Sequence, residues 1–124
     1  MSQSYAVSSI EEIKTKMLAE LQESMGDIAE SLLPELAPML LEDAPEMLKS
    51  LSLAIRAGNG AKVKELAHTL KGSCASMGIV GLAAICQDIE NMGKMNEMAN
   101  APDRLDDAYA EYKQVKLVLG RYVE

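Results

Sequence analysis

The apolar and polar positions along this chain follow the pattern of successive amphipathic helices. Apolar residues recur at helical spacing in several segments, and no segment alternates convincingly with the period of two that a half-buried strand requires. The expected helices run over about residues 9–24, 28–57, 61–77 and 82–92, and a last helix follows Pro102. Short connections between helices favour antiparallel neighbours. The sequence therefore predicts an all-α fold, an up-and-down antiparallel four-helix bundle with an additional N-terminal helix.

We expect one domain over residues 1–124, in which residues 1–25 hold the N-terminal helix and residues 27–122 form the bundle. The chain is long enough to bury a substantial core. It has nine Met and four Tyr but no Phe or Trp, so aliphatic and methionine side chains must fill that core. This composition suits helices packed on helices better than a sheet, where β-branched and aromatic residues are enriched.

Several helix ends carry recognisable signals. Ser9 and Glu12 have the spacing of a capping box, and Asp27 with Glu30 repeats that spacing. Gly58-Asn59-Gly60 is expected to end the second helix. That helix contains three prolines, which remove backbone donors and strain a helix interior, so we expect it to be kinked or divided. The prolines are Pro34, Pro38 and Pro45, and a polar connection from Gly93 to Ala101 is expected before the last helix.

Charge and cysteine content limit the classes of partner. The formal net charge of −7 disfavours binding to nucleic-acid phosphates and to anionic membrane surfaces, so we expect neither partner. No apolar run reaches the length of a membrane span, and the first five residues do not resemble a signal peptide. Cys74 and Cys86 fall on apolar faces and are expected to be buried thiols rather than a disulfide. We therefore expect a cytoplasmic protein, and a monomer because no dimerisation signal is evident.

The helix expected over residues 61–77 carries the candidate chemistry. On a helical wheel its apolar residues cluster on one face, and His68 falls roughly 150° from the centre of that cluster. Lys64 lies one turn before His68 and Lys71 one turn after it, so both are surface neighbours of the imidazole. A lone surface histidine is more often a solvated residue without a role, and lysines commonly decorate solvated faces.

A glycine next to this histidine favours a functional reading. Gly72 is predicted to face away from the core, where no internal contact offsets the cost of about 1 kcal/mol that a mid-helix glycine carries relative to alanine. Ala75 is another small residue on this side of the helix, and we call the open surface over Gly72 and Ala75 the clearing. The missing side chain would let a partner's active site close over His68, and two lysines would attract a phosphoryl group. Phosphoryl transfer depends mainly on positioning and charge stabilisation, and an exposed histidine on a rigid helix supplies the positioning.

The residues around His68 resemble the signature of the histidine-containing phosphotransfer (Hpt) family. The matching positions are residues 67–73 (AHTLKGS), Gly78, Leu82 and Glu90. Residues 41–48 (LEDAPEML) resemble the segment that precedes this signature in bacterial members. The similarity covers about residues 27–95, and the last helix fits as the final helix of the bundle.

The resemblance implies roles for individual residues. His68 would accept a phosphoryl group through Nε2, Lys71 would lie beside that group, and Gly72 would admit the partner. Ser73 matches a position that is often small or hydroxylic, and Lys94 matches a basic position on the neighbouring helix in some members.

Two positions depart from a common family pattern. Some members have a glutamine that assists the histidine where this chain has Glu90, so a supporting role for Glu90 stays open. Leu40 stands where many members have Phe, a change expected to affect packing rather than chemistry.

The resemblance implies a carrier that relays a phosphoryl group between receiver-domain aspartates in a multistep two-component phosphorelay. Its partners would be response-regulator receiver domains, including those of hybrid histidine kinases. The sequence has no nucleotide-binding motif and no carboxylate cluster suited to Mg²⁺. We therefore expect no enzyme activity of its own, no cofactor and no metal site, with Mg²⁺ bound by the partner receiver.

Two alternatives remain open. The first is the phosphoacceptor domain of a chemotaxis-type histidine kinase, which would be expected to continue into a kinase domain, whereas this sequence stops at Glu124. The second is a non-phosphorylated helical adaptor that binds a partner through the same face. His68 together with Lys71 and Gly72 favours the carrier, because an adaptor has no need of a nucleophile.

Overall fold

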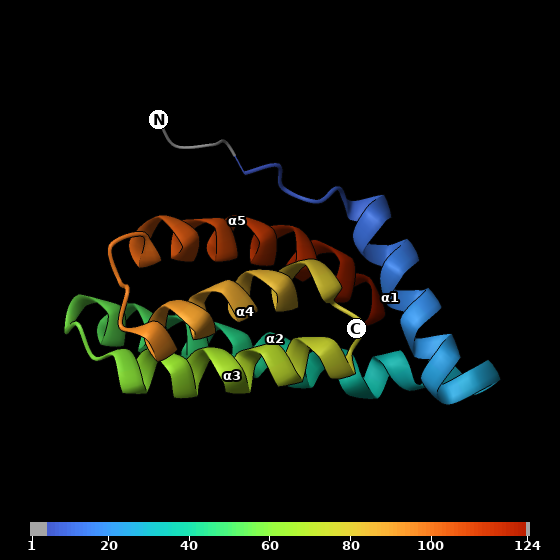
Figure 1. The fold of residues 1–124 in the computed structure, drawn as a ribbon. Coiled ribbons are helices and arrows are strands. Elements are labelled where there is room, and N and C mark those ends of the chain that lie inside the picture. The colour runs from blue at the N-terminus through green and yellow to red at the C-terminus, as the bar shows by residue number, and fades with distance from the viewer. Residues whose placement is uncertain (1–4, 124) are drawn as a thin grey trace.

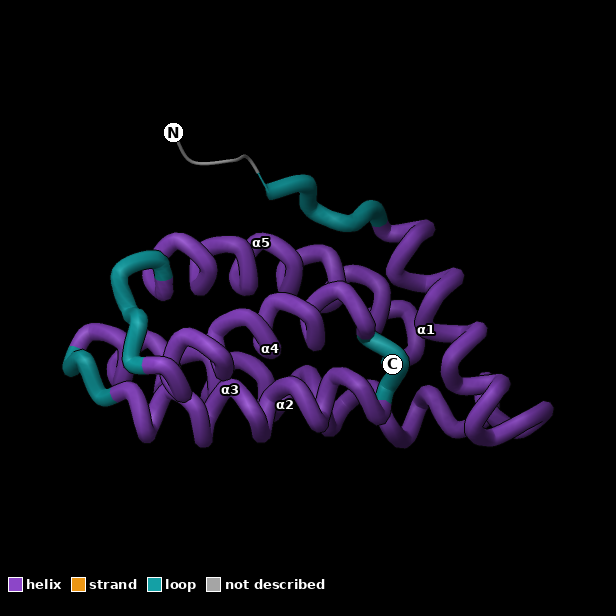
Figure 2. Tube along the Cα trace, in the orientation of Figure 1, coloured by secondary structure: helices purple, strands orange, loops and turns teal. Residues whose placement is uncertain are grey.

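Within the described part of the chain, five α-helices account for most residues (Figure 1). The structure is a computed structural model and describes residues 5–123, among which no strand occurs (Figure 2). The helices are α1 (Ile10–Met25), α2 (Ala29–Arg56), α3 (Gly60–Ser76), α4 (Val80–Met95) and α5 (Ala101–Leu119). Two short 3-10 helices, η1 (Gly26–Ile28) and η2 (Gly120–Tyr122), follow α1 and α5.

The helices α2 to α5 run alongside one another as an up-and-down bundle, and α1 lies across one end of it (Figure 1). The most extensive contact joins α3 to α4, while α2 packs against α3 and α5. The N-terminal helix α1 contacts α5, α2 and α4. The predicted four-helix bundle with an additional N-terminal helix is therefore confirmed.

Each bundle helix contributes one buried stripe to a common core. Leu48 of α2, Leu70 of α3, Ile85 of α4 and Leu119 of α5 are all buried almost completely. Buried positions repeat every three or four residues, as an amphipathic helix requires, so the opposite face of α3 is left to solvent. Among residues 5–123, no helix combines the length and the apolar character that a membrane crossing needs.

The prolines do not divide α2, which runs unbroken through all three of them. Of the two expected outcomes, a kink or a division, the division does not occur. All three prolines lie outside the buried stripe of α2. Each lacks the N–H that would bond the carbonyl four residues earlier, and the residues that carry those carbonyls also lie outside the stripe. Those carbonyls belong to Glu30, Pro34 and Leu41, four residues before each proline, and these residues are exposed or half-buried. Water can therefore replace the missing backbone donors, and burial of the other face of α2 holds the helix together.

The capping prediction is confirmed at one helix and wrong at another. Ser9 and Glu12 form the predicted capping box at the start of α1, with both hydrogen bonds at 3.1 Å. Asp27 does not cap α2 with Glu30, because it lies inside η1 and the chain enters α2 through Ile28 in helical conformation. A side-chain cap requires a non-helical residue at that point.

The last connection is shorter than the sequence suggested. The α4 helix extends to Met95 rather than ending near Met92, and it closes at Asn96 in left-handed conformation. The residues between α4 and α5 are therefore 96–100. The extra turn of α4 matters for the site, because it places Lys94 on a helix rather than in a loop.

Glycine is required at the turn between α3 and α4. Gly78 has a φ of 74°, and a Cβ atom there would lie 2.8 Å from the carbonyl oxygen of Met17. The α1 backbone therefore packs directly against this turn, which fixes α1 to the end of the α3–α4 pair.

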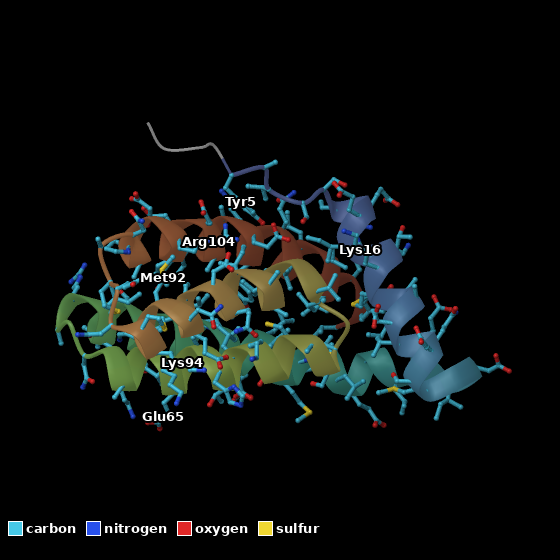
Figure 3. All side chains as sticks on the ribbon, viewed as in Figure 1. Tyr5, Lys16, Glu65, Met92, Lys94 and Arg104 are labelled. Carbon is cyan, nitrogen blue, oxygen red and sulfur yellow. The ribbon has the colours of Figure 1, made fainter. Side chains whose placement is uncertain are left out.

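The segment before α1 folds back along α5 (Figure 1). The Tyr5 hydroxyl and the backbone amide of Ser8 both donate to the same oxygen of Glu111, a carboxylate that is fully buried. The Arg104 guanidinium lies over the Tyr5 ring, 5.3 Å from its centre, and pairs with Asp88 of α4 at 2.7 Å (Figure 3). These contacts fasten the N-terminal segment to α5.

Candidate functional site

The α3 helix presents its candidate residues on the side away from the core. Its start is fixed by Asn59, whose side chain accepts a hydrogen bond from the amide of Lys62 at 3.1 Å. Its buried face is formed by Val63, Ala67, Leu70 and Cys74. The His68 side chain is 67% exposed, so the outward orientation predicted from the helical wheel is confirmed.

Glu90 of α4 determines which ring nitrogen of His68 carries the proton. Its Oε1 atom lies 3.2 Å from Nδ1 of His68. An ionised carboxylate can only accept hydrogen bonds, so Nδ1 must carry the proton in this contact. In the neutral imidazole this leaves the lone pair on Nε2, which makes no hydrogen bond within residues 5–123. The position of Glu90 thus leaves Nε2 as the ring nitrogen with a free lone pair.

Lys71 reaches the same carboxylate oxygen from α3. Its Nζ atom lies 2.8 Å from Oε1 of Glu90, and its side chain is largely covered. Donation by Lys71, and to a lesser extent by His68, holds the pKa of the Glu90 carboxyl below its usual range, against a smaller opposing effect of partial burial. Lys71 and His68 are therefore neighbours, joined through Glu90.

A second acceptor on α4 holds Lys71. The side-chain carbonyl of Gln87 accepts a hydrogen bond from Lys71 Nζ at 2.9 Å, and the amide nitrogen of Gln87 donates to Asn91 at 3.0 Å. The sequence reasoning missed Gln87 and Asn91. Gln87 lies three residues before Glu90 and so on the same side of α4, but which side chain of α3 it meets depends on the register between the two helices.

The clearing beside His68 has the predicted form. A Cβ atom built on Gly72 would meet no heavy atom within 4 Å, so this mid-helix glycine faces open space. Ala75 is exposed as well. The hydroxyl of Ser73 is half-buried and bonds within the helix to the carbonyl of Thr69 at 3.2 Å. Next to this clearing, Met39 of α2 is exposed beside an open hollow between α2 and α3.

The other two predicted lysines, Lys64 and Lys94, make none of the contacts that join Lys71 to Glu90 and Gln87. Lys64 is exposed one turn before His68, and both line a shallow hollow on α3. Lys94 is exposed near the end of α4, one turn beyond Glu90 (Figure 3). Neither forms an ion pair with a carboxylate of the described chain, so of the three predicted lysines only Lys71 is bound into the site.

Comparison with known proteins identifies the family. The model of the Hpt domain matches residues 35–121, which is most of the chain. The chain belongs to the Hpt domain family. A crystal structure of histidine-containing phosphotransfer protein B (HptB) from Pseudomonas aeruginosa PAO1 superposes on this Hpt domain with a TM-score of 0.72 and 31% sequence identity, covering 85% of this chain and 88% of that one. A search of curated proteins returned no match.

Family and structure together give this Hpt domain a function in histidine phosphotransfer within phosphorelays. Proteins of this family interact with receiver domains. The matched region begins inside α2 and includes all of α3 and α4, so it contains His68, Lys71, Glu90 and the clearing at Gly72. The N-terminal segment and α1 lie outside the matched region.

Proposed function

We propose that His68 is the phosphoacceptor and that it carries the phosphoryl group on Nε2 between receiver-domain aspartates. The observation that supports this most strongly is that His68 is the single histidine of the chain. A member of a histidine phosphotransfer family with one histidine has one candidate acceptor. That residue also has the exposed position and the Nδ1 partner that a phosphoacceptor requires.

The proposed step needs no proton transfer at the reacting nitrogen. The lone pair on Nε2 of His68 forms a bond to phosphorus, and the bond between phosphorus and the receiver's aspartate oxygen breaks, so that the aspartate leaves as a carboxylate. Nδ1 keeps its proton throughout, and this N–H continues to donate a hydrogen bond to Glu90. The same step in reverse, toward the aspartate of a second receiver, passes the group on.

We propose a distinct contribution for each neighbour. Lys71 stabilises the phosphoryl oxygens from beside the ring, and Gly72 and Ala75 leave room for the partner. Lys64 and Lys94 add positive charge around the site. Ser73 adds no protruding side chain to this surface, because its hydroxyl donates a hydrogen bond to the helix backbone.

The partner is proposed to supply Mg²⁺ and most of the stabilisation of the transition state. The nearby carboxylate, Glu90, already accepts hydrogen bonds from Lys71 and His68, which opposes its use as a metal ligand. On this proposal the protein is a phosphorylated carrier without catalysis of its own. It works as a monomer in the cytoplasm, where its two free buried thiols fit a reducing environment.

The experiment that tests the proposal follows radioactive phosphate from phosphorylated receiver domains to this protein. Wild type is expected to take up label that is acid-labile and base-stable, as a phosphoramidate is, and His68→Gln is expected to take up none. With ATP and Mg²⁺ alone, wild type is expected to stay unlabelled. Equal labelling of His68→Gln would rule out His68 as the acceptor, and labelling by ATP alone would show an active site of its own.

A further inference from the structure

The Lys71 ammonium is held in place by two acceptors on the neighbouring helix. Its Nζ atom lies 2.8 Å from Oε1 of Glu90 and 2.9 Å from Oε1 of Gln87. An ammonium group has three N–H donors and no acceptor. Two donors are therefore used by α4, and one remains for a group that arrives from outside.

The orientation of the Gln87 amide agrees with both of its contacts. Its nitrogen donates to Oδ1 of Asn91 at 3.0 Å, one turn further along α4. Because Lys71 can only donate, the Gln87 oxygen rather than its nitrogen must face Nζ, and the hydrogen bond to Asn91 favours the same orientation. Gln87 is half-buried, so its side chain has fewer alternative positions than that of an exposed glutamine.

Holding Lys71 in place before the phosphoryl group arrives lowers the entropic cost of phosphoryl transfer. A lysine side chain loses considerable rotamer freedom when its head group is fixed. If the fold has already removed that freedom, the cost is not incurred again during phosphoryl transfer, which depends on preorganised charge. A single acceptor fixes one direction of an ammonium group, whereas two acceptors on the same helix also restrict its rotation.

We propose that Gln87 is a positioning residue for phosphotransfer: together with Glu90 it holds the Lys71 ammonium beside His68, with its third N–H free for the phosphoryl group. Gln87 acts through Lys71 and touches neither the phosphoryl group nor the imidazole. The inference rests on the proposed role of His68 and adds a residue of α4 to the machinery.

The test uses phosphoramidate, a small donor that requires no receiver domain. In the reaction its P–N bond breaks, ammonia leaves, and a bond forms between phosphorus and Nε2 of His68. Gln87→Met removes the acceptor but keeps a good helix former of similar length. We expect it to lower the rate of His68 phosphorylation by about three- to tenfold, the range expected if lysine freedom must be lost during the reaction. The matched control, Gln22→Met on the exposed face of α1, should react like wild type.

A double-mutant cycle with Lys71→Met shows whether Gln87 acts through Lys71. In the Lys71→Met background, Gln87→Met is expected to cause no further loss of rate. NMR relaxation at the Lys71 Cε methylene provides a readout without any phosphoryl donor, and we expect greater mobility in Gln87→Met than in wild type. Circular dichroism establishes that each variant is folded before its rate is compared.

The outcomes separate this inference from the proposed function. A wild-type rate in Gln87→Met, an equal further loss in the Lys71→Met background, or unchanged mobility of Lys71 would each overturn the positioning role. Phosphorylation of His68→Gln at the wild-type rate would instead overturn His68 as the acceptor. The mobility of Lys71 would still decide whether Gln87 holds it.

Discussion

Glu90 of α4 approaches His68 of α3 through Nδ1, at 3.2 Å, and so leaves Nε2 as the free nitrogen. The same oxygen of Glu90 receives Lys71 at 2.8 Å. The site is therefore shared between two helices: α3 carries His68 and Lys71, and α4 carries the acceptors that both of them contact. Because α3 and α4 form the most extensive helix contact of the bundle, this geometry is built into the fold.

Replacing Glu90 with leucine is expected to change the tautomer of His68. Leucine offers no acceptor for the proton on Nδ1, so the ring loses its preference for the form that has its lone pair on Nε2. We expect the ¹⁵N chemical shifts of His68 to move toward the other tautomer, and phosphorylation by phosphoramidate to slow by about tenfold or more. Glu90→Gln retains a carbonyl acceptor and is expected to keep the wild-type tautomer. Identical ¹⁵N shifts in wild type and Glu90→Leu would contradict this role.

The lowered pKa of Glu90 predicts how stability depends on pH. The contribution of such a carboxylate is fully present above the pKa of an unfolded-chain glutamate, about 4.3, and is lost as the pH falls through the lower pKa of the folded state. Urea unfolding below that value should therefore show a steeper loss of unfolding free energy in wild type than in Glu90→Gln. Glu97→Gln, at an exposed position, provides the matched control. Parallel pH curves for wild type and Glu90→Gln would show that the carboxylate contributes nothing.

Much of α3 could be predicted from its sequence, because one helix and its periodicity determine which residues face outward. The outward directions of His68 and Gly72 follow from that periodicity. The continuity of α2 could not be predicted in this way, since the cost of each proline depends on which face of the helix becomes buried against neighbours. The contacts of Lys71 with Gln87 and Glu90 could not be predicted from the sequence either, because they depend on the register between α3 and α4.

Gly72→Gln is expected to separate stability from transfer. Gly72 faces open space, so a glutamine there should keep the unfolding free energy or raise it by up to about 1 kcal/mol. Transfer from a phosphorylated receiver should fall by orders of magnitude, because the new side chain stands one turn from His68. Phosphorylation by phosphoramidate should change little, since a small donor needs less room. A variant that is clearly less stable, or one that accepts from receivers at the full rate, would contradict a role in partner access.

Tyr5→Phe is expected to weaken the attachment of the N-terminal segment without affecting the phosphotransfer site. The mutation removes the hydroxyl that donates to Glu111, and so leaves a fully buried carboxylate with one donor fewer. Loss of a partner from a buried polar group costs about 1–3 kcal/mol, measured as unfolding free energy in urea. The rate with phosphoramidate should be unchanged. The control is Tyr109→Phe at an exposed position, and equal stability of the two variants would show that Tyr5 does not fasten this segment.

The most direct test of the central claim is an NMR measurement of where phosphorus is attached. With ¹⁵N-labelled histidine, the protein contains one imidazole, so its two ring nitrogens give an unambiguous pair of signals. After phosphorylation by a receiver domain, we predict ³¹P–¹⁵N coupling at Nε2 of His68, with the proton still on Nδ1. Coupling at Nδ1, or phosphorus bound to the protein without coupling to either nitrogen, would contradict the assignment of Nε2 of His68 as the phosphoacceptor.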